Sequence, residues 1–266
     1  MSDVRKRRRR RRRRGREKSH WLLNTILVIS IIVFGVSAFQ LFKIGKGYLD
    51  GRSEYDKIRD IAVTTKDSED EEEKDAFQVD FEKLLEINPD TIGWIRFDPE
   101  PDVISYPIVQ GKDNYEYLHK TFSANENTLG AIFLSVDNDK SFGDRNSIIY
   151  GHRMKDGSMF RHLQDYEKKE FWEKNPYFYI YTLDGRTLKY HIYSAGVVKD
   201  TSDTYLTQFS TDEEYENFLQ MTKQVSNYDT GVEVGIQDKI VTLSTCTSAS
   251  DDHRFVVRGV LEEGEN

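Results

Sequence analysis

The chain has one cysteine, Cys246, at the end of an apolar segment, Ile240–Cys246, that is typical of a buried β-strand running into a loop. Strand alternation puts Thr242, Ser244 and Cys246 on one face, which becomes more polar toward the thiol, as expected where a strand ends at a groove. A thiol becomes a nucleophile only where a nearby cation or imidazolium favours its thiolate form, and is otherwise a small inert core residue. Cys246 is therefore reactive only if the chain supplies such partners.

His152 is the histidine that the sequence best places at a strand end. A β-rich run ends at Gly151, a residue that lets the chain turn sharply and leaves the next imidazole at the end of the strand. A surface loop histidine is the alternative. His253 is a rival base because it lies close to Cys246 in the sequence, but we interpret it as flanking Arg254.

Arg254 begins the last predicted strand and shares one face with Val256 and Arg258, so either guanidinium could reach a groove beside the thiol. A guanidinium in that place could clamp a substrate backbone and oppose the charge of an oxyanion. A solvated arginine on an edge strand is the alternative.

The segments around these candidates resemble the sortase family, and class B sortases most closely. Thr242–Cys246 matches the signature Thr-Leu-x-Thr-Cys without departure, and His253–Val260 is similar to the arginine-bearing last strand of the family. Four earlier segments also have class B character: Tyr106–Gln110, Asp113–Leu118, Gly130–Leu134 and Gly151–Phe160. The resemblance covers residues 75 to 262.

The resemblance implies a cysteine transpeptidase whose catalytic residues are Cys246, His152 and Arg254. Its partners would be surface proteins with a C-terminal sorting motif of the Asn-Pro-x-Thr type, and an amine of a peptidoglycan precursor. The family resemblance implies neither a metal nor another cofactor, and the acidic residues form no compact calcium-loop pattern. Position in the matching motifs gives four candidate substrate-binding residues: Asn114, Leu118, Tyr150 and Ser244.

Three alternatives stay open at this stage. The chain could be a cysteine peptidase that only hydrolyses its target, or a catalytically silent surface-binding domain. It could also be a pilus-type sortase, although the Asp-Pro-aromatic lid segment expected there is not found: Asp98-Pro99 is followed by Glu100.

An N-terminal anchor is expected to place this chemistry outside the cytoplasm. Residues 1–20 form a basic tail with eight consecutive arginines, and residues 21–42 form an apolar run. A helix of that length reaches roughly 33 Å, enough to cross a bilayer core. The positive-inside rule then predicts a single-pass signal anchor with a cytoplasmic N-terminus and an extracellular catalytic domain. A stalk and acidic linker (43–75) would precede the catalytic domain (76–266).

Charge and cysteine content narrow the class further. The first 18 residues carry twelve Lys/Arg and two acidic residues, a net charge of +10. Because the whole chain has a net charge of −8, the remaining residues carry −18. Such an acidic domain is unsuited to binding nucleic acid. With one cysteine there is no internal disulfide, which fits a Gram-positive cell surface better than an animal secretory pathway.

The fold class predicted for the catalytic domain is mainly β, a closed or nearly closed sortase-type barrel with short flanking and inserted helices. A hairpin is expected around Asp184-Gly185, and helices over 81–87, 159–166 and 212–225, the last with a capping signal beginning at Ser210. Short β-rich runs mark the strands: 92–97, 104–109, 131–134, 147–150, 177–183, 186–194, 239–245 and 255–261.

Overall fold

The computed structural model describes residues 2–66, 76–247 and 252–262, and the chain divides into two compact units, Met1–Leu49 and Asp50–Asn266. The first unit consists of the N-terminal part of helix α1 (Ser2–Ala62). Trp21–Ala62 is the one helical stretch among the described residues that is long and apolar enough to cross a membrane, and its apolar window is fully exposed. The predicted anchor, 21–42, lies inside this stretch. Most of the predicted acidic linker (67–75) lies outside the described residues.

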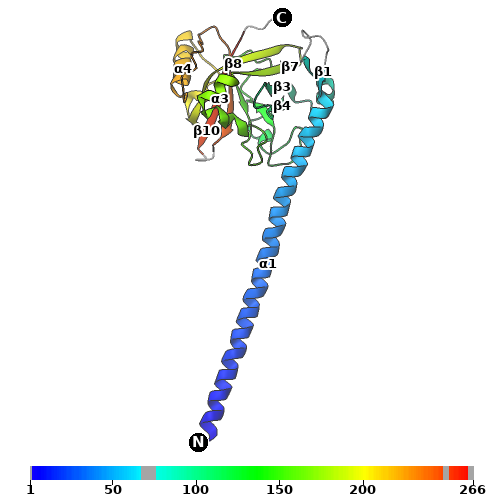
Figure 1. Cartoon of the computed structure of the whole chain (residues 1–266), viewed down its shortest axis with the longest axis vertical. Coiled ribbons are helices and arrows are strands. Elements are labelled where there is room, and N and C mark those ends of the chain that lie inside the picture. The colour runs from blue at the N-terminus through cyan, green and yellow to red at the C-terminus, as the bar shows by residue number, and fades with distance from the viewer. Residues whose placement is uncertain (1, 67–75, 248–251, 263–266) are drawn as a thin grey trace. The chain divides into compact units, whose positions relative to one another are not determined.

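The second unit is built on a closed barrel of eight strands in the order β10-β8-β7-β3-β4-β5-β6-β9, which confirms the predicted fold class (Figure 1). Two neighbouring pairs, β4–β5 and β6–β9, are parallel, and the others are antiparallel. The strands are β3 (Thr91–Phe97), β4 (Ser105–Val109), β5 (Ile132–Leu134), β6 (Asn146–Tyr150), β7 (Tyr177–Thr182), β8 (Thr187–Lys199), β9 (Ile240–Cys246) and β10 (His253–Leu261).

The β7–β8 hairpin follows directly from its sequence. Tyrosines alternate with Phe178, Ile180 and Thr182 along β7, and the tyrosines are half-buried while the other three are buried. The turn at Asp184-Gly185 needs a left-handed residue, and Gly185 supplies it with φ +85°. The predicted hairpin is confirmed.

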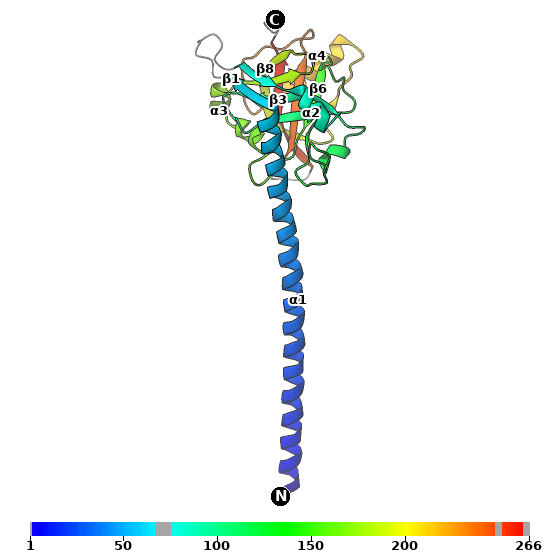
Figure 2. The same cartoon turned by 90° about the vertical axis from the view of Figure 1, so that its right-hand side faces the viewer.

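A small two-stranded sheet, β1 (Val63–Lys66) with β2 (Ala76–Val79), connects α1 to the barrel and was not predicted (Figure 2). The ring of Phe77 packs on Trp94 and Tyr181, with centroid separations of 6.4 and 4.8 Å. Aromatic contact with the barrel therefore holds this sheet against β3 and β7.

Short helices occupy the connections between strands. They are α2 (Phe81–Ile87), η1 (Glu116–Leu118), η2 (Arg161–Glu167), α3 (Lys169–Lys174), η3 (Asp203–Tyr205) and α4 (Asp212–Gln224), where η marks a 3₁₀ helix. The helix expected over 159–166 is instead the 3₁₀ helix η2, because Met159 has φ +58° and its N–H donates to the Tyr106 hydroxyl.

Helix α4 covers the barrel beside β8 (Figure 1). One face of the helix is buried, and its residues Tyr215, Phe218 and Leu219 pack against Tyr193 of β8 and Ile240 of β9. The capping residue is Thr211 and not Ser210. The Thr211 hydroxyl accepts a hydrogen bond from the Glu214 N–H at 3.1 Å, while the Glu214 carboxylate accepts from the Ser210 N–H.

We predict that Thr211→Ala lowers the free energy of unfolding by about 1 kcal/mol, because it removes the N-cap of the helix that covers β8 and β9. Ser210→Ala is the matched control, since Ser210 contributes its backbone N–H and not its side chain to the capping box. Urea denaturation of both variants would decide the cap. Equal losses, or a larger loss for Ser210→Ala, would contradict this assignment.

Candidate active site

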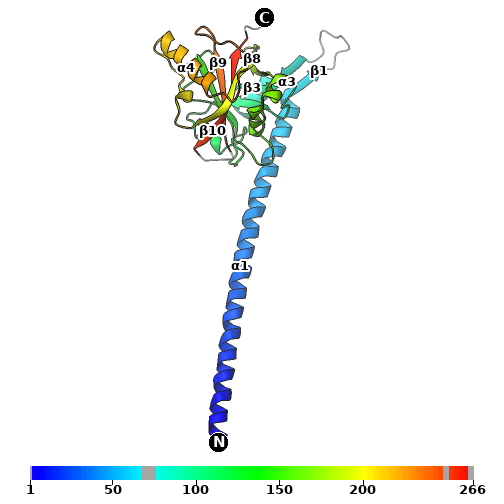
Figure 3. The ribbon, with the colours of Figure 1, turned by 60° about the vertical axis from the view of Figure 1, so that its left-hand side comes forward.

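The three predicted catalytic residues lie at the ends of three neighbouring barrel strands, β6, β9 and β10. Strand β9 pairs with β6 in parallel and with β10 in antiparallel register. Strands β8, β9 and β10 are seen side by side in Figure 3. Because β6 is parallel to β9, it ends at the edge of the barrel where β9 ends. Because β10 is antiparallel to β9, it begins at that edge. The topology thus brings residues that are distant in sequence to one edge of the barrel.

Cys246 is the last residue of β9 and its side chain is exposed. Its Cα partner across the β9–β10 ladder is Arg254, and directly opposed residues in such a ladder have neighbouring side chains. The Arg254 guanidinium donates to the backbone oxygen of His253 at 3.0 Å and lies 3.4 Å from the Asp200 carboxylate. An accessible thiol therefore lies beside an oriented cation.

His152 follows β6 by two residues. Tyr150 is the Cα partner of Ser244, and the Gly151 N–H donates to the Ser244 carbonyl oxygen at 3.1 Å. The ladder ends at this pair, two residues before His152 and two residues before Cys246. Both residues therefore lie just beyond the end of the β6–β9 ladder.

The role of Gly151 differs from the predicted one. Gly151 does not adopt a left-handed conformation. A Cβ added there would meet Ile132 Cδ1 at 2.5 Å and Phe160 Cδ2 at 2.6 Å, so glycine is needed for close packing and not for a special turn.

Backbone groups fix the orientation and the tautomer of the His152 ring. Its Nε2 lies 2.7 Å from the Leu118 carbonyl oxygen, which can only accept, so Nε2 carries a proton. Nδ1 is then the nitrogen whose protonation state changes. Burial lowers the pKa of His152 from its ordinary value of 6.5, the hydrogen bond to Leu118 opposes this shift, and His119 adds to it.

Gly130 forms the tightest wall of the His152 site. It has φ +62°, and a Cβ built on it would lie 2.8 Å from His152 Cδ2, 2.8 Å from the Tyr117 carbonyl oxygen and 2.9 Å from that of Leu118. Both its conformation and its surroundings therefore require glycine.

Two of the predicted substrate-binding residues, Tyr150 and Ser244, are joined through a third residue, Tyr205. The Tyr205 hydroxyl shares a hydrogen bond of 2.9 Å with the Ser244 hydroxyl, and its ring stacks on Tyr150 at a centroid separation of 6.2 Å. Burial raises the pKa of Tyr150 to about 12, so its phenol stays protonated at neutral pH. These residues form a polar and aromatic cluster at the end of β9, with Ser244 buried beneath it.

The other two predicted substrate-binding residues lie on the 113–118 segment. Asn114 donates to the Ser135 hydroxyl at 3.2 Å and accepts from the Val136 N–H at 2.9 Å. Leu118 is half-buried, and its carbonyl oxygen holds His152. Asn114 is thus fixed by the residues after β5, and Leu118 lies at the imidazole.

The structure separates the two arginines that the sequence could not distinguish. Arg258 is fully buried and donates to the hydroxyls of Ser194 and Thr204, each at 3.2 Å. Burial lowers the pKa of Arg258. It is part of the barrel interior, and Arg254 is the arginine paired with the thiol strand end.

Two neighbours of the site escaped sequence reasoning. Tyr205 comes from η3, and its contacts with Ser244 and Tyr150 exist only in the folded chain. Burial lowers the pKa of Arg153, Arg161 adds to this shift, and Cys246 opposes it. The position of Arg153 directly after His152 was the available signal. Its Nε donates to Gln164 Oε1 at 2.9 Å.

The chain matches known proteins over most of its length. The sortase domain family model matches residues 99–262. Sortase B of Listeria monocytogenes is 35% identical over 239 residues, which cover 88% of this chain and 95% of that protein. Sortase B of Staphylococcus aureus is 33% identical over 233 residues, covering 86% and 89% of the two chains.

Solved structures agree. Sortase B from B. anthracis in complex with AAEK1 superposes with a TM-score of 0.70 at 34% identity, covering 82% of this chain and 99% of that chain. A Staphylococcus aureus sortase B-substrate complex gives a TM-score of 0.64 at 33% identity, covering 70% and 85%.

The barrel and these likenesses define a cysteine transpeptidase, an enzyme of acyl transfer. The chain belongs to the sortase family and, within it, to class B.

We predict that Gly130→Ala lowers kcat by ~10–100-fold, because the new methyl group must displace the His152 ring or the carbonyl oxygen that holds it. Gly185→Ala is the control, since Gly185 also has a left-handed φ (+85°) but nothing within 4 Å of the added Cβ. Both variants should lose about 1–2 kcal/mol of stability from a left-handed alanine, and Gly130→Ala should lose more because of its clashes. Equal turnover in the two would contradict a crowded His152 site.

The lowered pKa of His152 also predicts a pH-dependent stability. The unfolded chain takes up this proton at a higher pH than the folded chain does. The stability due to neutral His152 is therefore present above pH 6.5 and is lost as the pH falls through the lowered pKa. Between about pH 8 and pH 5, the unfolding free energy of the wild type should fall relative to that of His152→Gln. Urea denaturation at each pH measures this difference. If the unfolding free energies of the two proteins change equally with pH, a buried neutral imidazole is contradicted.

Proposed function

We propose that this chain is a membrane-anchored sortase that cleaves the C-terminal sorting motif of a surface protein after threonine and joins the protein to a peptidoglycan amine. The motif proposed is of the Asn-Pro-x-Thr type. The observation that carries the proposal is the register of β6, β9 and β10, which groups His152, Cys246 and Arg254 at one edge of the barrel. The class B family supplies the reaction type.

In the first half-reaction Cys246 gives its thiol proton to His152, and the resulting thiolate attacks the carbonyl carbon of the threonine, forming a C–S bond and a tetrahedral oxyanion. The Arg254 guanidinium, opposite Cys246 in the ladder, opposes this charge. The C–N bond then breaks, and protonated His152 gives its proton to the departing amine. The products are a thioester on Cys246 and a free C-terminal fragment.

In the second half-reaction an amine attacks the thioester and gives its proton to His152. A new amide forms, the C–S bond breaks and the Cys246 thiolate is restored, so no water is consumed. Because Nε2 of His152 donates to the Leu118 carbonyl oxygen, we assign both proton transfers to Nδ1. Burial weakens proton binding at this nitrogen, which assists release of the proton to the leaving amine.

The substrate-binding residues proposed are Ser244, Tyr150, Asn114 and Leu118, with Tyr205 added from the structure. Ser244 lies two residues before the nucleophile on β9, and its hydroxyl bond to Tyr205 couples it to the Tyr150 ring. The similar Staphylococcus aureus sortase B has been solved as a complex with substrate, which supports a peptide-binding groove in this barrel.

The proposed topology has a cytoplasmic basic tail (1–20), a membrane span (21–42), a stalk and linker (43–75) and an extracellular catalytic domain (76–266). The eight consecutive arginines before the apolar stretch support this orientation. A Gram-positive cell envelope is proposed as well, supported by the single cysteine, which leaves this extracellular domain without an internal disulfide.

We predict that Cys246→Ala lowers cleavage of peptides from a library built around Asn-Pro-x-Thr by ~10⁴-fold or more, because no thioester forms. Mass spectrometry of the wild-type products with an added oligoglycine amine should show ligated peptide in place of free acid.

Three outcomes of this experiment would contradict the proposal. Free acid as the sole product would indicate a peptidase that only hydrolyses. Full turnover by Cys246→Ala would exclude this nucleophile. A wild-type chain that leaves every library peptide intact would exclude the proposed substrate class.

A further inference from the structure

The C-terminal part of α1, Asp50–Ala62, packs against the catalytic barrel within the second compact unit. Its buried residues, Gly51, Tyr55, Ile58 and Ala62, recur at the spacing of one helix face. A Cβ on Gly51 would lie 3.0 Å from Leu129 Cδ2, so the helix approaches the segment before Gly130 closely. The first part of the predicted stalk and linker (43–75) is thus a helix whose last three turns pack on the barrel.

Two neighbouring side chains of this helix bind the segment 118–130, which runs from the last residue of η1 toward β5. The Glu54 carboxylate accepts hydrogen bonds from the Thr121 hydroxyl at 2.9 Å and the Ser123 N–H at 3.0 Å. The Tyr55 hydroxyl accepts from the Phe122 N–H at 3.1 Å and donates to the Gly130 carbonyl oxygen at 2.7 Å. Tyr55 is 4% exposed, so the two hydrogen bonds of its hydroxyl are shielded from water.

Both ends of the segment held in this way contact the imidazole of His152. At one end the Leu118 carbonyl oxygen accepts from Nε2 at 2.7 Å. At the other end Gly130, whose oxygen receives the Tyr55 hydroxyl bond, packs against His152 Cδ2. A shift of this segment would therefore move the acceptor and the wall of the ring together.

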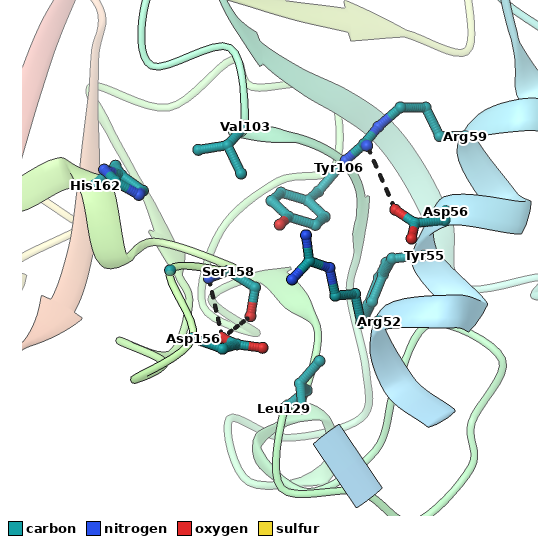
Figure 4. Close-up of a pocket in the computed structure, with 11 residues that line it drawn as sticks. Arg52, Tyr55, Asp56, Arg59, Val103, Tyr106, Leu129, Asp156, Ser158 and His162 are labelled. Carbon is teal, nitrogen blue, oxygen red and sulfur yellow. Dashed lines mark hydrogen bonds and ion pairs between the residues drawn. The ribbon is translucent and has the colours of Figure 1, made fainter. Parts of the chain in front are cut away.

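Tyr55 also supports the far end of the loop that begins at His152. Its ring packs edge-on against Tyr106 at 5.4 Å, and the Tyr106 hydroxyl accepts from the Met159 N–H at 3.1 Å. The loop is closed by the Phe160 N–H, which donates to the His152 carbonyl oxygen at 2.9 Å. Tyr55 and Tyr106 line a cavity of about 170 Å³ together with Asp156 and Ser158 of this loop. Figure 4 shows these four side chains around the cavity.

We propose that Tyr55 and Glu54, in the C-terminal part of α1 (Asp50–Ala62), are positioning residues for His152. Packing of this part of the helix on the barrel then sets the geometry of the proton transfer. The proposal rests on the catalytic role proposed for His152. In addition to connecting the barrel to the membrane anchor, the helix would hold the segment that orients His152.

The decisive variant is Tyr55→Phe in the full chain in detergent micelles, because it removes one hydroxyl and keeps the ring that packs on Tyr106. Glu54→Gln tests the second contact. Tyr228→Phe is the matched control, since the Tyr228 hydroxyl donates to the Tyr166 carbonyl oxygen at 2.9 Å and contacts none of the segments around His152 described above. Thermal denaturation compares the stability cost of the two tyrosine variants.

We expect Tyr55→Phe to lower kcat for an Asn-Pro-x-Thr peptide by ~10-fold with little change in KM, because the peptide still binds while the proton-transfer group is misplaced. In spectra of ¹³C-histidine-labelled chain, the His152 resonance should shift and its pKa should rise toward the ordinary value as water reaches the ring. Glu54→Gln should change both readouts in the same direction, and Tyr228→Phe should change neither.

A Tyr55→Phe chain with wild-type kcat and an unchanged His152 resonance would overturn the inference. An equal loss of kcat in Tyr228→Phe would also overturn it, by showing a general effect of stability. The proposed function fails separately, if His152→Ala keeps full turnover. Even then the His152 resonance in Tyr55→Phe still reports whether the helix holds the ring.

Discussion

The register that joins β6, β9 and β10 is the constraint on which the rest of the site depends. Gly151 donates to the Ser244 carbonyl oxygen, and Cys246 faces Arg254 across the next ladder. Because side chains alternate along a strand, a slip of one residue in either ladder would turn a reactive group to the other face. Backbone hydrogen bonds of a closed barrel resist such a slip, since the barrel has no free edge. The barrel therefore supplies precision that loops alone would not.

Around this fixed edge, backbone carbonyls and glycines do more of the positioning than charged side chains. His152 is held by a carbonyl oxygen and confined by Gly130, and burial lowers the pKa of its imidazole. Such an environment favours a histidine that exchanges a proton readily over one held permanently charged. Cys246 is exposed at the strand end, as a nucleophile for a macromolecular substrate must be. The buried Arg258 instead bonds to hydroxyls inside the barrel.

The sequence predicted the barrel because strand alternation and turn residues are local signals, as at Gly185. It predicted the grouping of Cys246 and His152 through motifs, since parallel pairing of β6 with β9 leaves no local trace. Residues that act through long-range contact escaped it: Tyr205 on η3 and Tyr55 on α1 reach the site only in the folded chain. The helix expected from 159 failed for a related reason, because a backbone bond from Met159 to a distant tyrosine overrides the local pattern.

In the proposed reaction Cys246 carries the acyl group between two amines. Intact-mass analysis of the full chain, incubated with an Asn-Pro-x-Thr peptide and no added amine, would detect this acyl-enzyme. We expect one adduct with the mass of the N-terminal peptide fragment less water, mapped to Cys246 and discharged by an added amine to give ligated peptide. Product that accumulates without any adduct on Cys246, or an adduct mapped to another residue, would contradict it.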